Sequence, residues 1–584
     1  MVYVMRKIHI LRAFFLVLPK LARVAPLQFA LWQCIAVLHG LSFAILTPAT
    51  QLFFERATAL ATGHADMASV MAALLCLAAA HVVMQILNGI CNFIPMMYTQ
   101  KAHGVFSAAL FQKINRLTPI QWENTRVLDD INKALKGEQE SIYFTNTILM
   151  LLTFYLPYFL FMALYLWRCK PLLVISLLLV FLPTLLTQLL RTKLFAKAED
   201  ASAPVRRELE YAESCIAGRE FFKETRTLGA FGYFRDLFQS SASLLNRLQM
   251  RASVRADLAE LGMKLLSLVG YAGILLLLLD ALLANEISVG AFAAIFNSVA
   301  QMFSMMREII CSHFGSVAGT YGRVQNYLAF MQAEAPERPA LQFNSGDIVA
   351  DHISFTYPQA TQPAIRDVSL TIHAGETVAL VGENGSGKST LARLLLGLYE
   401  PEHGRIERGP SASSAVFQQY QRYQMTLRDN ITISDFCAPA EDDKLELVSR
   451  RAGLDVYGRS FPAGLDTMLS REFDGVDLSG GQWQRVAIAR GLFRNHELIV
   501  LDEPTAAIDP IEETQVYNRF AQMAKDKTAL IITHRLGSVR LADRILVMQQ
   551  GRLVQQGTHE SLMAAGGEYA RLYAAQEQWY ESNS

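Results

Sequence analysis

Long apolar runs alternate with polar gaps along the first half of the chain. A helix needs about 20 predominantly apolar residues to cross a bilayer, and the pattern predicts an all-α domain of six transmembrane helices over 25–333. The runs 145–167 and 171–190 contain neither a charged residue nor a histidine. The six runs lie near 26–54, 68–98, 145–167, 171–190, 262–283 and 289–307.

The gaps between these runs alternate between short and long, and Lys and Arg gather in the long ones, near 101–144 and 192–255. Basic residues favour the cytoplasmic side of a membrane, so we expect both long gaps and both termini in the cytoplasm. Both long gaps have a helical pattern and should prolong the spanning helices. Two turns, 118–122 and 218–222, are candidates for contact with a cytoplasmic domain, and ordinary helix packing is an equal alternative for each.

The first 24 residues mix apolar side chains with five cations. This mixture predicts an amphipathic helix on the cytoplasmic membrane surface. A cleaved signal peptide is the alternative, but Arg12 interrupts the apolar stretch and no small-x-small cleavage site follows.

Two of the predicted spans carry polar residues on one helical face. Polar side chains are costly inside a membrane and so call for an explanation. We expect the two stripes to line a cavity for a transported substrate; the alternative is that they form hydrogen bonds between helices. The stripes are His81, Gln85, Asn88 and Asn92 in the second span and Asn297, Gln301, Ser304 and Glu308 in the sixth.

The pattern changes beyond 333. Residues 334–346 are rich in proline and polar residues without periodicity, which indicates a linker. From 347 to 584, short runs of Val, Ile and Leu alternate with amphipathic helices, which predicts an α/β domain with a largely parallel sheet. The expected fold class is therefore multidomain, with a six-helix transmembrane domain followed by an α/β domain.

Composition agrees with this division into two domains and argues against several classes of partner and site. The chain has 584 residues, 52% of them hydrophobic, and a mean hydropathy of +0.22. Its 53 basic and 53 acidic residues balance, which gives no indication of a nucleic-acid partner. The seven cysteines are scattered and never form a CxxC pair, which argues against a disulfide framework or a zinc site.

A strand expected at 377–381 runs into a glycine-rich loop that opens a helix. This context indicates a phosphate-binding loop, in which backbone N–H groups surround the phosphates of ATP. Lys388 would reach the β and γ phosphates, and Ser389 would be a ligand of Mg²⁺. ATP and Mg²⁺ are thus the expected cofactors. The ATP-binding residues are Gly382, Glu383, Asn384, Gly385, Ser386, Gly387, Lys388, Ser389 and Thr390.

A second apolar strand, expected at 498–501, ends in two adjacent carboxylates, Asp502 and Glu503. Ligands of such sheets bind at the carboxyl ends of the strands. Asp502 would hold Mg²⁺ through water, and Glu503 would act as the general base on the attacking water.

The sequence Leu478-Ser479-Gly480-Gly481-Gln482 precedes another predicted helix. Because this motif follows the phosphate-binding loop, the chain closely resembles the ATP-binding cassette (ABC) transporter family. The resemblance implies that Ser479 and the following glycines close on the nucleotide of an opposite cassette. This chain has one cassette, so it is expected to work as a dimer, for which a homodimer is favoured and a heterodimer is the alternative.

The resemblance implies roles for four further residues. Tyr357 matches the aromatic residue that stacks on adenine, and Gln418 matches the glutamine that contacts Mg²⁺ and water. Asp509 matches the aspartate loop, although alanine replaces a serine common there, and His534 matches the histidine that meets the γ-phosphate. The expected catalytic residues are Lys388, Gln418, Glu503 and His534.

Membrane domain before cassette is the order of half-size exporters, which implies ATP-driven export by alternating access across a bacterial cytoplasmic membrane. The cassette motifs are similar to those of lantibiotic and peptide exporters, so a peptide is the expected cargo. The short segment before the first span leaves no room for a fused peptidase, so such a peptide would be matured elsewhere. A multidrug or lipid exporter is the alternative, and a membrane-bound regulatory ATPase that moves no cargo is the alternative of another class.

Overall fold

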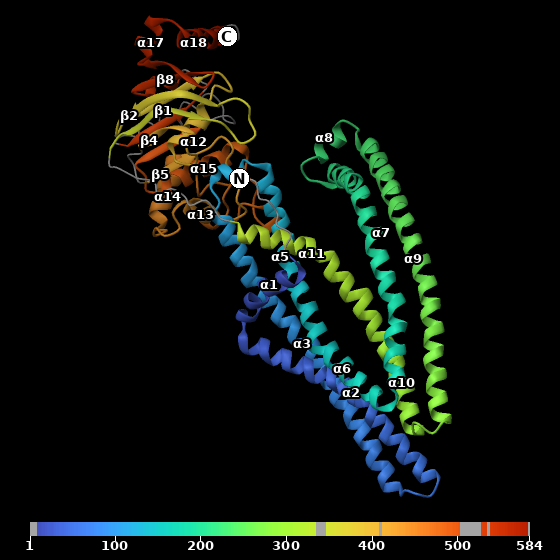
Figure 1. The fold of residues 1–584 in the computed structure, drawn as a ribbon. Helices are drawn as coiled ribbons and strands as arrows, with labels where there is room; N and C mark the ends of the chain where they lie inside the picture. Colours follow the sequence, from blue (N-terminus) through green and yellow to red (C-terminus); the bar gives the residue numbers. More distant parts are fainter. Residues whose placement is uncertain (1–8, 334–345, 408–411, 503–526, 534–537, 582–584) are drawn as a thin grey trace. The chain divides into compact units, whose positions relative to one another are not determined.

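The computed structural model describes residues 9–333, 346–407, 412–502, 527–533 and 538–581. The chain divides into two compact units (Figure 1). The membrane unit comprises Met1–Asn115 and Asp129–Ala335, and the cassette unit comprises Arg116–Leu128 and Pro336–Ser584. The short segment 116–128 therefore belongs to the cassette unit, although it lies within the predicted transmembrane domain in the sequence.

The described residues of the membrane unit form helices joined by short turns. Six helices are long and apolar enough to cross a membrane, which confirms the predicted number. The long polar gaps are helical as well, so that α3, α7 and α9 reach 49, 47 and 53 residues. The helices are α1 (Ile10–Val24), α2 (Pro26–Ala61), α3 (Met67–Asn115), α5 (Thr125–Met150), α6 (Leu156–Cys169), α7 (Pro171–Ala217), α8 (Phe222–Thr227), α9 (Phe231–Leu283), α10 (Val289–Arg307) and α11 (Gly315–Gln332).

Two π-helical segments interrupt this pattern, η1 (Leu151–Tyr155) before α6 and η2 (Glu308–Phe314) after α10. π-Helical turns are rare and occur frequently at functional sites. Tyr155 and His313 join them through a hydrogen bond of 3.1 Å.

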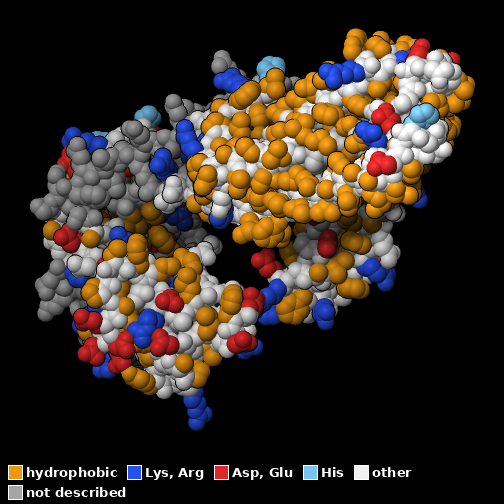
Figure 2. Space-filling model, turned by 90° about the horizontal axis from the view of Figure 1, so that it is seen from below, with side chains coloured by type: hydrophobic (Ala, Val, Ile, Leu, Met, Phe, Trp, Pro, Cys, Tyr) orange, Lys and Arg blue, Asp and Glu red, His pale blue; other side chains and the backbone are white. Residues whose placement is uncertain are grey.

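Helices α7 and α9 pack side by side, and α2 packs against α3 and α10 (Figure 1). Close approach of backbones shapes the packing at Gly40 of α2, where a Cβ atom would clash with the carbonyl oxygen of Phe154. Large apolar side chains remain exposed along these helices, and Figure 2 shows how closely they cover one face. Such a surface suits hydrocarbon rather than water.

The described residues of the cassette unit form two sheets. A three-stranded antiparallel sheet has the order β2-β1-β4, and a six-stranded sheet has the order β5-β6-β7-β3-β8-β9. Only the β8–β9 pairing of the larger sheet is antiparallel. The strands are β1 (Ile348–Phe355), β2 (Ile365–Ile372), β3 (Thr377–Gly382), β4 (His403–Glu407), β5 (Ser413–Val416), β6 (Leu498–Asp502), β7 (Thr528–Ile532), β8 (Arg544–Gln549) and β9 (Arg552–Gly557).

Helices surround these sheets, and their apolar faces complete the cores on which the strands pack. The strands β6 and β7 are buried along their whole length, as expected for parallel strands covered on both faces. The helices are α4 (Pro119–Trp122), α12 (Lys388–Leu395), α13 (Leu427–Thr432), α14 (Asp442–Ala452), α15 (Gly480–Phe493), α17 (His559–Ala565) and α18 (Glu568–Glu581), with short 3₁₀ turns η3 (Ile433–Asp435), η4 (Gly464–Asp466), η5 (Arg471–Phe473) and η6 (Ser538–Leu541).

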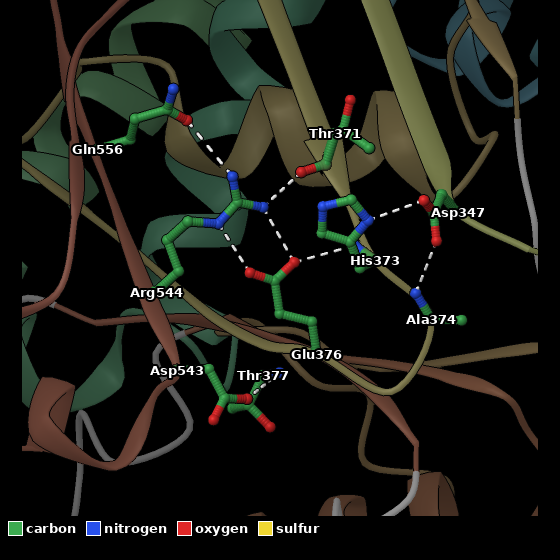
Figure 3. A network of polar contacts seen from close by, with 9 residues as sticks. All are labelled: Asp347, Thr371, His373, Ala374, Glu376, Thr377, Asp543, Arg544 and Gln556. Atoms are coloured by element: carbon green, nitrogen blue, oxygen red, sulfur yellow. Dashed lines mark hydrogen bonds and ion pairs between the residues drawn. The ribbon is translucent and has the colours of Figure 1, made fainter.

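A polar network ties the two sheets together (Figure 3). The Arg544 guanidinium, at the start of β8, donates to both carboxylate oxygens of Glu376 at 2.7 and 2.9 Å. The same guanidinium donates to the carbonyl oxygen of Thr371 in β2. Because the side chains of Arg544 and Glu376 are only 23% and 13% exposed, this bidentate pair is partly shielded from water.

Candidate nucleotide site and membrane cavity

The glycine-rich loop lies between β3 and α12 and contains three glycines with positive φ. Gly382, Gly385 and Gly387 have φ of +149°, +78° and +102°, which L side chains rarely adopt. A Cβ atom at Gly382 would also clash with the carbonyl oxygen of Met548 on β8. The backbone can follow this path only because these positions are glycine.

Lys388, at the start of α12, is 5% exposed and turns back over the loop. Its Nζ donates to the carbonyl oxygens of Gly382 at 3.0 Å and Glu383 at 2.9 Å. Gly387 is the N-cap residue and offers no side-chain cap, so no side chain at that position blocks the N–H groups of the first turn. Such helix starts bind anionic phosphate groups.

The two residues expected to hold Mg²⁺ lie together. The Ser389 hydroxyl of α12 donates to Oδ1 of Asp502 at 3.1 Å, and Asp502, at the end of β6, is 4% exposed. A hydroxyl and a carboxylate fit Mg²⁺, which prefers oxygen ligands and is held by one or two carboxylates together with substrate phosphates. Gln418 follows β5 at the same carboxyl edge of the sheet. Glu503, Asp509 and His534 lie outside the described residues.

Tyr357 lies beside the start of α12, where it shares a hydrogen bond of 3.0 Å with Thr390. Arg393, one turn further along α12, donates to the Tyr357 phenol oxygen at 3.1 Å. The ring of Tyr399 meets that of Tyr357 edge-on, with centroids 5.8 Å apart. Sequence reasoning identified Tyr357 but missed Arg393 and Tyr399, which belong to no motif.

Of the two candidate contact turns, the one at 118–122 forms α4 and contacts the cassette. A capping box between Thr118 and Gln121 starts the helix, and Ile120 packs against the core of the sheets. The Tyr399 hydroxyl donates to the Glu123 carboxylate at 2.5 Å. Burial and this carboxylate raise the pKa of Tyr399 well above its usual range. The turn at 218–222 joins α7 to α8 within the membrane unit.

The signature segment begins α15. Ser479 is the N-cap residue, and its hydroxyl and the Gln482 side chain each accept from the other's backbone N–H, at 3.3 and 2.9 Å. Gln482 also donates to Ser460 at 2.7 Å, and Tyr420 donates to the carbonyl oxygen of Gly480 at 2.8 Å. These bonds fix an exposed helix start, the feature that a second phosphate-binding surface requires.

In the membrane unit, parts of both polar stripes line one cavity of about 630 Å³ among α2, α3, α5, η1, α10 and η2. Asn88, Asn92, Gln301, Ser304 and Glu308 are among its lining residues. The other three stripe residues lie elsewhere. His81 and Gln85 line a separate hollow, and Asn297 is exposed and lines neither.

Two buried polar atoms of this cavity have no hydrogen-bond partner among the described residues: Nε2 of His39 and Oδ1 of Asn146. Asn146 donates through its other atom to Thr99, at 3.3 Å. Sequence reasoning missed His39 and Asn146 because no polar residue stands four positions before or after either of them, unlike the members of the two stripes. The cavity thus offers amides and hydroxyls together with one carboxylate, Glu308.

Comparison with known proteins identifies the cassette. Residues 365–506 match the family model described as ABC transporter. The chain is 35% identical over 251 residues to the nisin transport ATP-binding protein NisT of Lactococcus lactis subsp. lactis, covering 41% of this chain and 42% of that protein. It is 32% identical over 393 residues to the ATP-dependent lipid A-core flippase of Alkalilimnicola ehrlichii, covering 63% and 64%. The chain spans about half the length of the curated relatives it matches.

The fold has a solved counterpart over nearly the whole chain. A bacterial Atm1-family ABC exporter with ATP bound superposes with a TM-score of 0.77 and covers 93% of this chain and 98% of its own. At 22% identity, this likeness shows the fold alone, a six-helix domain followed by an α/β domain.

Proposed function

The chain carries an ABC transporter ATPase domain and has the fold of an ABC exporter, and from this premise we propose that it exports a cargo across a bacterial cytoplasmic membrane at the expense of ATP. Two copies would form the working unit, with the termini and cassettes in the cytoplasm. ATP binding would draw the cassettes together and hydrolysis would release them, which biases the membrane units between two states.

The observation that carries the proposal is the meeting of Lys388, Ser389 and Asp502 at one edge of the cassette sheet. In ATP binding, the Lys388 ammonium would leave the loop carbonyls for the β and γ phosphates, and Tyr357 would stack on adenine. Ser389, Asp502 and Gln418 would hold Mg²⁺, which supplies positive charge to the phosphates when bound.

Hydrolysis would require residues on both sides of the γ-phosphate. Glu503 would take the proton of the attacking water, and His534 would hold the γ-phosphate. Ser479, Gly480, Gly481 and Gln482 of the second copy would close the site, and Asp509 would line the contact between cassettes. Two composite sites would therefore form in one dimer.

A peptide is the cargo that the larger cavity supports best. The unpartnered Oδ1 of Asn146 can accept an amide N–H group, and Nε2 of His39 can bond to either group of a peptide unit, according to its tautomer. Glu308 can pair with a cationic side chain. Relatives include proteins named for nisin and subtilin transport, and others named as lipid A-core flippases. A lipid exporter is therefore the second candidate, favoured by a second cavity of the membrane unit that both the cation Arg307 and the aromatic ring of Phe303 line.

The test uses the full-length chain in sealed inside-out vesicles with a leader-bearing cationic peptide. We expect ATP-dependent uptake that Glu503→Gln abolishes, and uptake that Asn146→Ala reduces at least about five-fold through one lost hydrogen bond. Asn297→Ala is the matched control, since this asparagine lies outside the cavity. ATP hydrolysis without uptake of peptide or lipid would refute export and support a regulatory ATPase.

A further inference from the structure

A second cavity, of about 420 Å³, lies among α7, α9, α10 and η2 of the membrane unit. It is separated from the larger cavity by α10, whose Ser304 lines both. The neighbours Arg307 and Glu308 lie on opposite sides of this wall, with Arg307 in the second cavity and Glu308 in the first. The two cavities therefore differ in charge.

One end of the second cavity is cationic. The Glu260 carboxylate pairs with Lys264 at 2.7 Å and with Arg191 at 3.2 Å. The Arg307 guanidinium, which also lines this end, forms no hydrogen bond or ion pair with any residue that the structure describes. Two cations, Lys264 and Arg307, and one carboxylate, Glu260, therefore line this end, and Arg191 pairs with Glu260 without lining the cavity. The hydroxyl of Ser267, which also lines the cavity, is buried and has no partner within the described ranges.

The other end of the cavity is apolar. The ring of Phe303 lies 5.1 Å from that of Phe181 and 5.1 Å from that of Tyr271, centroid to centroid. Leu268 extends this wall. The cavity therefore has the polarity of an amphiphile, with an anion-binding end and a hydrocarbon-binding end.

The cations at this end lie at similar distances from the short-loop ends of their helices, and hence at a similar depth in the membrane. Arg191, Lys264 and Arg307 each stand about 20 residues from the short-loop ends of their helices, or about 30 Å at the α-helical rise. That distance is about the thickness of the hydrocarbon core, so the cations fall at the headgroup level of one leaflet. The aromatic wall lies closer to the short loops and hence within the hydrocarbon.

We propose that this cavity binds an acyl lipid with a net anionic phosphodiester headgroup. The Arg307 guanidinium donates to the phosphate oxygens, with Lys264 and the Ser267 hydroxyl beside it, and the acyl chain lies along Phe181 and Phe303. Snorkelling of Arg and Lys to bulk headgroups explains cations at this depth, but it does not explain an aromatic cavity wall beside them or a buried hydroxyl without a partner among the described residues. The site depends on membrane insertion and does not require the proposed ATP hydrolysis or peptide export.

The test is native mass spectrometry of the full-length chain in a neutral detergent, with lysophosphatidylglycerol and lysophosphatidylcholine of the same acyl chain. Both lipids contain a phosphodiester, and they differ in net charge. We expect the wild type to bind the anionic lipid at least about ten-fold more tightly, the factor that a charge-assisted hydrogen bond supplies. Arg307→Gln should remove this preference and Arg307→Lys should retain part of it.

Arg255→Gln is the matched control, because Arg255 is an exposed cation of α9 outside the cavity. Equal binding of the two lipids by the wild type would overturn the proposal. Loss of the preference for the anionic lipid to the same extent in the Arg255 and Arg307 variants would also overturn it. Since Arg307 has no bond in the described structure, its variant should keep the thermal unfolding temperature of the wild type. Phe303→Ala should weaken the binding of both lipids to the same extent. This result would distinguish the apolar end of the cavity, which contacts the acyl chain, from the cationic end, which contacts the headgroup.

Discussion

A chain of hydrogen bonds connects the turn after α4 with the helix of the phosphate-binding loop. Tyr399 donates to the Glu123 carboxylate at 2.5 Å. Arg393 donates to both phenol oxygens, to Tyr399 at 3.5 Å and to Tyr357 at 3.1 Å. Tyr357 in turn shares a hydrogen bond with Thr390. If Tyr357 stacks on adenine, breaking the bond between Glu123 and Tyr399 should weaken ATP binding, although neither residue would touch the nucleotide.

The expected size follows from the exposure of this bond. A hydrogen bond to a charged group contributes about 1.5–3 kcal/mol when it is buried. Glu123 is exposed, so solvent screening reduces the coupling to about 1 kcal/mol. One kcal/mol is a factor of about five in an equilibrium constant. Tyr399→Phe and Glu123→Met should therefore each raise the Kd of ATP up to about five-fold, and the double variant should raise it no further.

The assay is displacement of a fluorescent ATP analogue from the full-length chain in lipid nanodiscs, without Mg²⁺ so that hydrolysis does not interfere. The control is Gln359→Met. Gln359 donates to Asn124 and Thr125 in the same turn, at 3.3 and 3.2 Å, but lies outside the hydrogen-bond chain. Additive effects of the two single changes would refute the coupling. If Gln359→Met raised the Kd of ATP equally, the effect would come from general packing of the turn against the cassette and not from the hydrogen-bond chain.

Three further changes test the cassette. Gly382→Ala should abolish binding of the fluorescent ATP analogue, because alanine is strained at φ +149° and its Cβ would meet the Met548 carbonyl. Glu376→Gln breaks a partly shielded ion pair with Arg544 and should lower the free energy of unfolding in urea by about 2 kcal/mol. A backbone N–H and a neighbouring histidine lower the pKa of Asp347, so its contribution to stability is present above its unfolded pKa of about 4 and is lost as the pH falls through the folded value. Asp347→Asn should therefore flatten the fall of the cassette's unfolding temperature below about pH 5.

The nucleotide site was largely predictable because its determinants are local in the sequence. A phosphate-binding loop needs glycines at fixed offsets, and the strand before it and the helix after it follow from short patterns. The pairing of Ser389 with Asp502 followed from topology, since parallel strands bring their carboxyl ends to one edge. Arg393 and Tyr399 were not predictable in this way. Their role depends on contact with Glu123, more than 250 residues earlier, and no periodicity encodes that contact.

The six spanning helices were predictable from hydropathy, whereas the elements that each helix face packs against were not. Helical periodicity places residues on one face but does not say what that face meets. For the same reason the sequence counted residues 116–128 with the transmembrane domain, while their apolar contacts place them in the cassette unit. A boundary drawn from composition follows the order of the chain, and a boundary drawn from packing need not.

The polar stripes show where this distinction matters for function. A cavity extends along only part of a helix, so residues on one helix face need not all line it. The stripe residues nearest the helix starts at Met67 and Val289 lie outside the larger cavity. The members further along, including Asn92 and Glu308, line it together. Helix α10 separates this cavity from the cationic one. The α10 face that carries Arg307 therefore serves the cationic cavity and not the cavity that the stripes line. A substitution at Glu308 should therefore alter recognition of cationic cargo, whereas one at Arg307, the preceding residue, should alter recognition of anionic lipid.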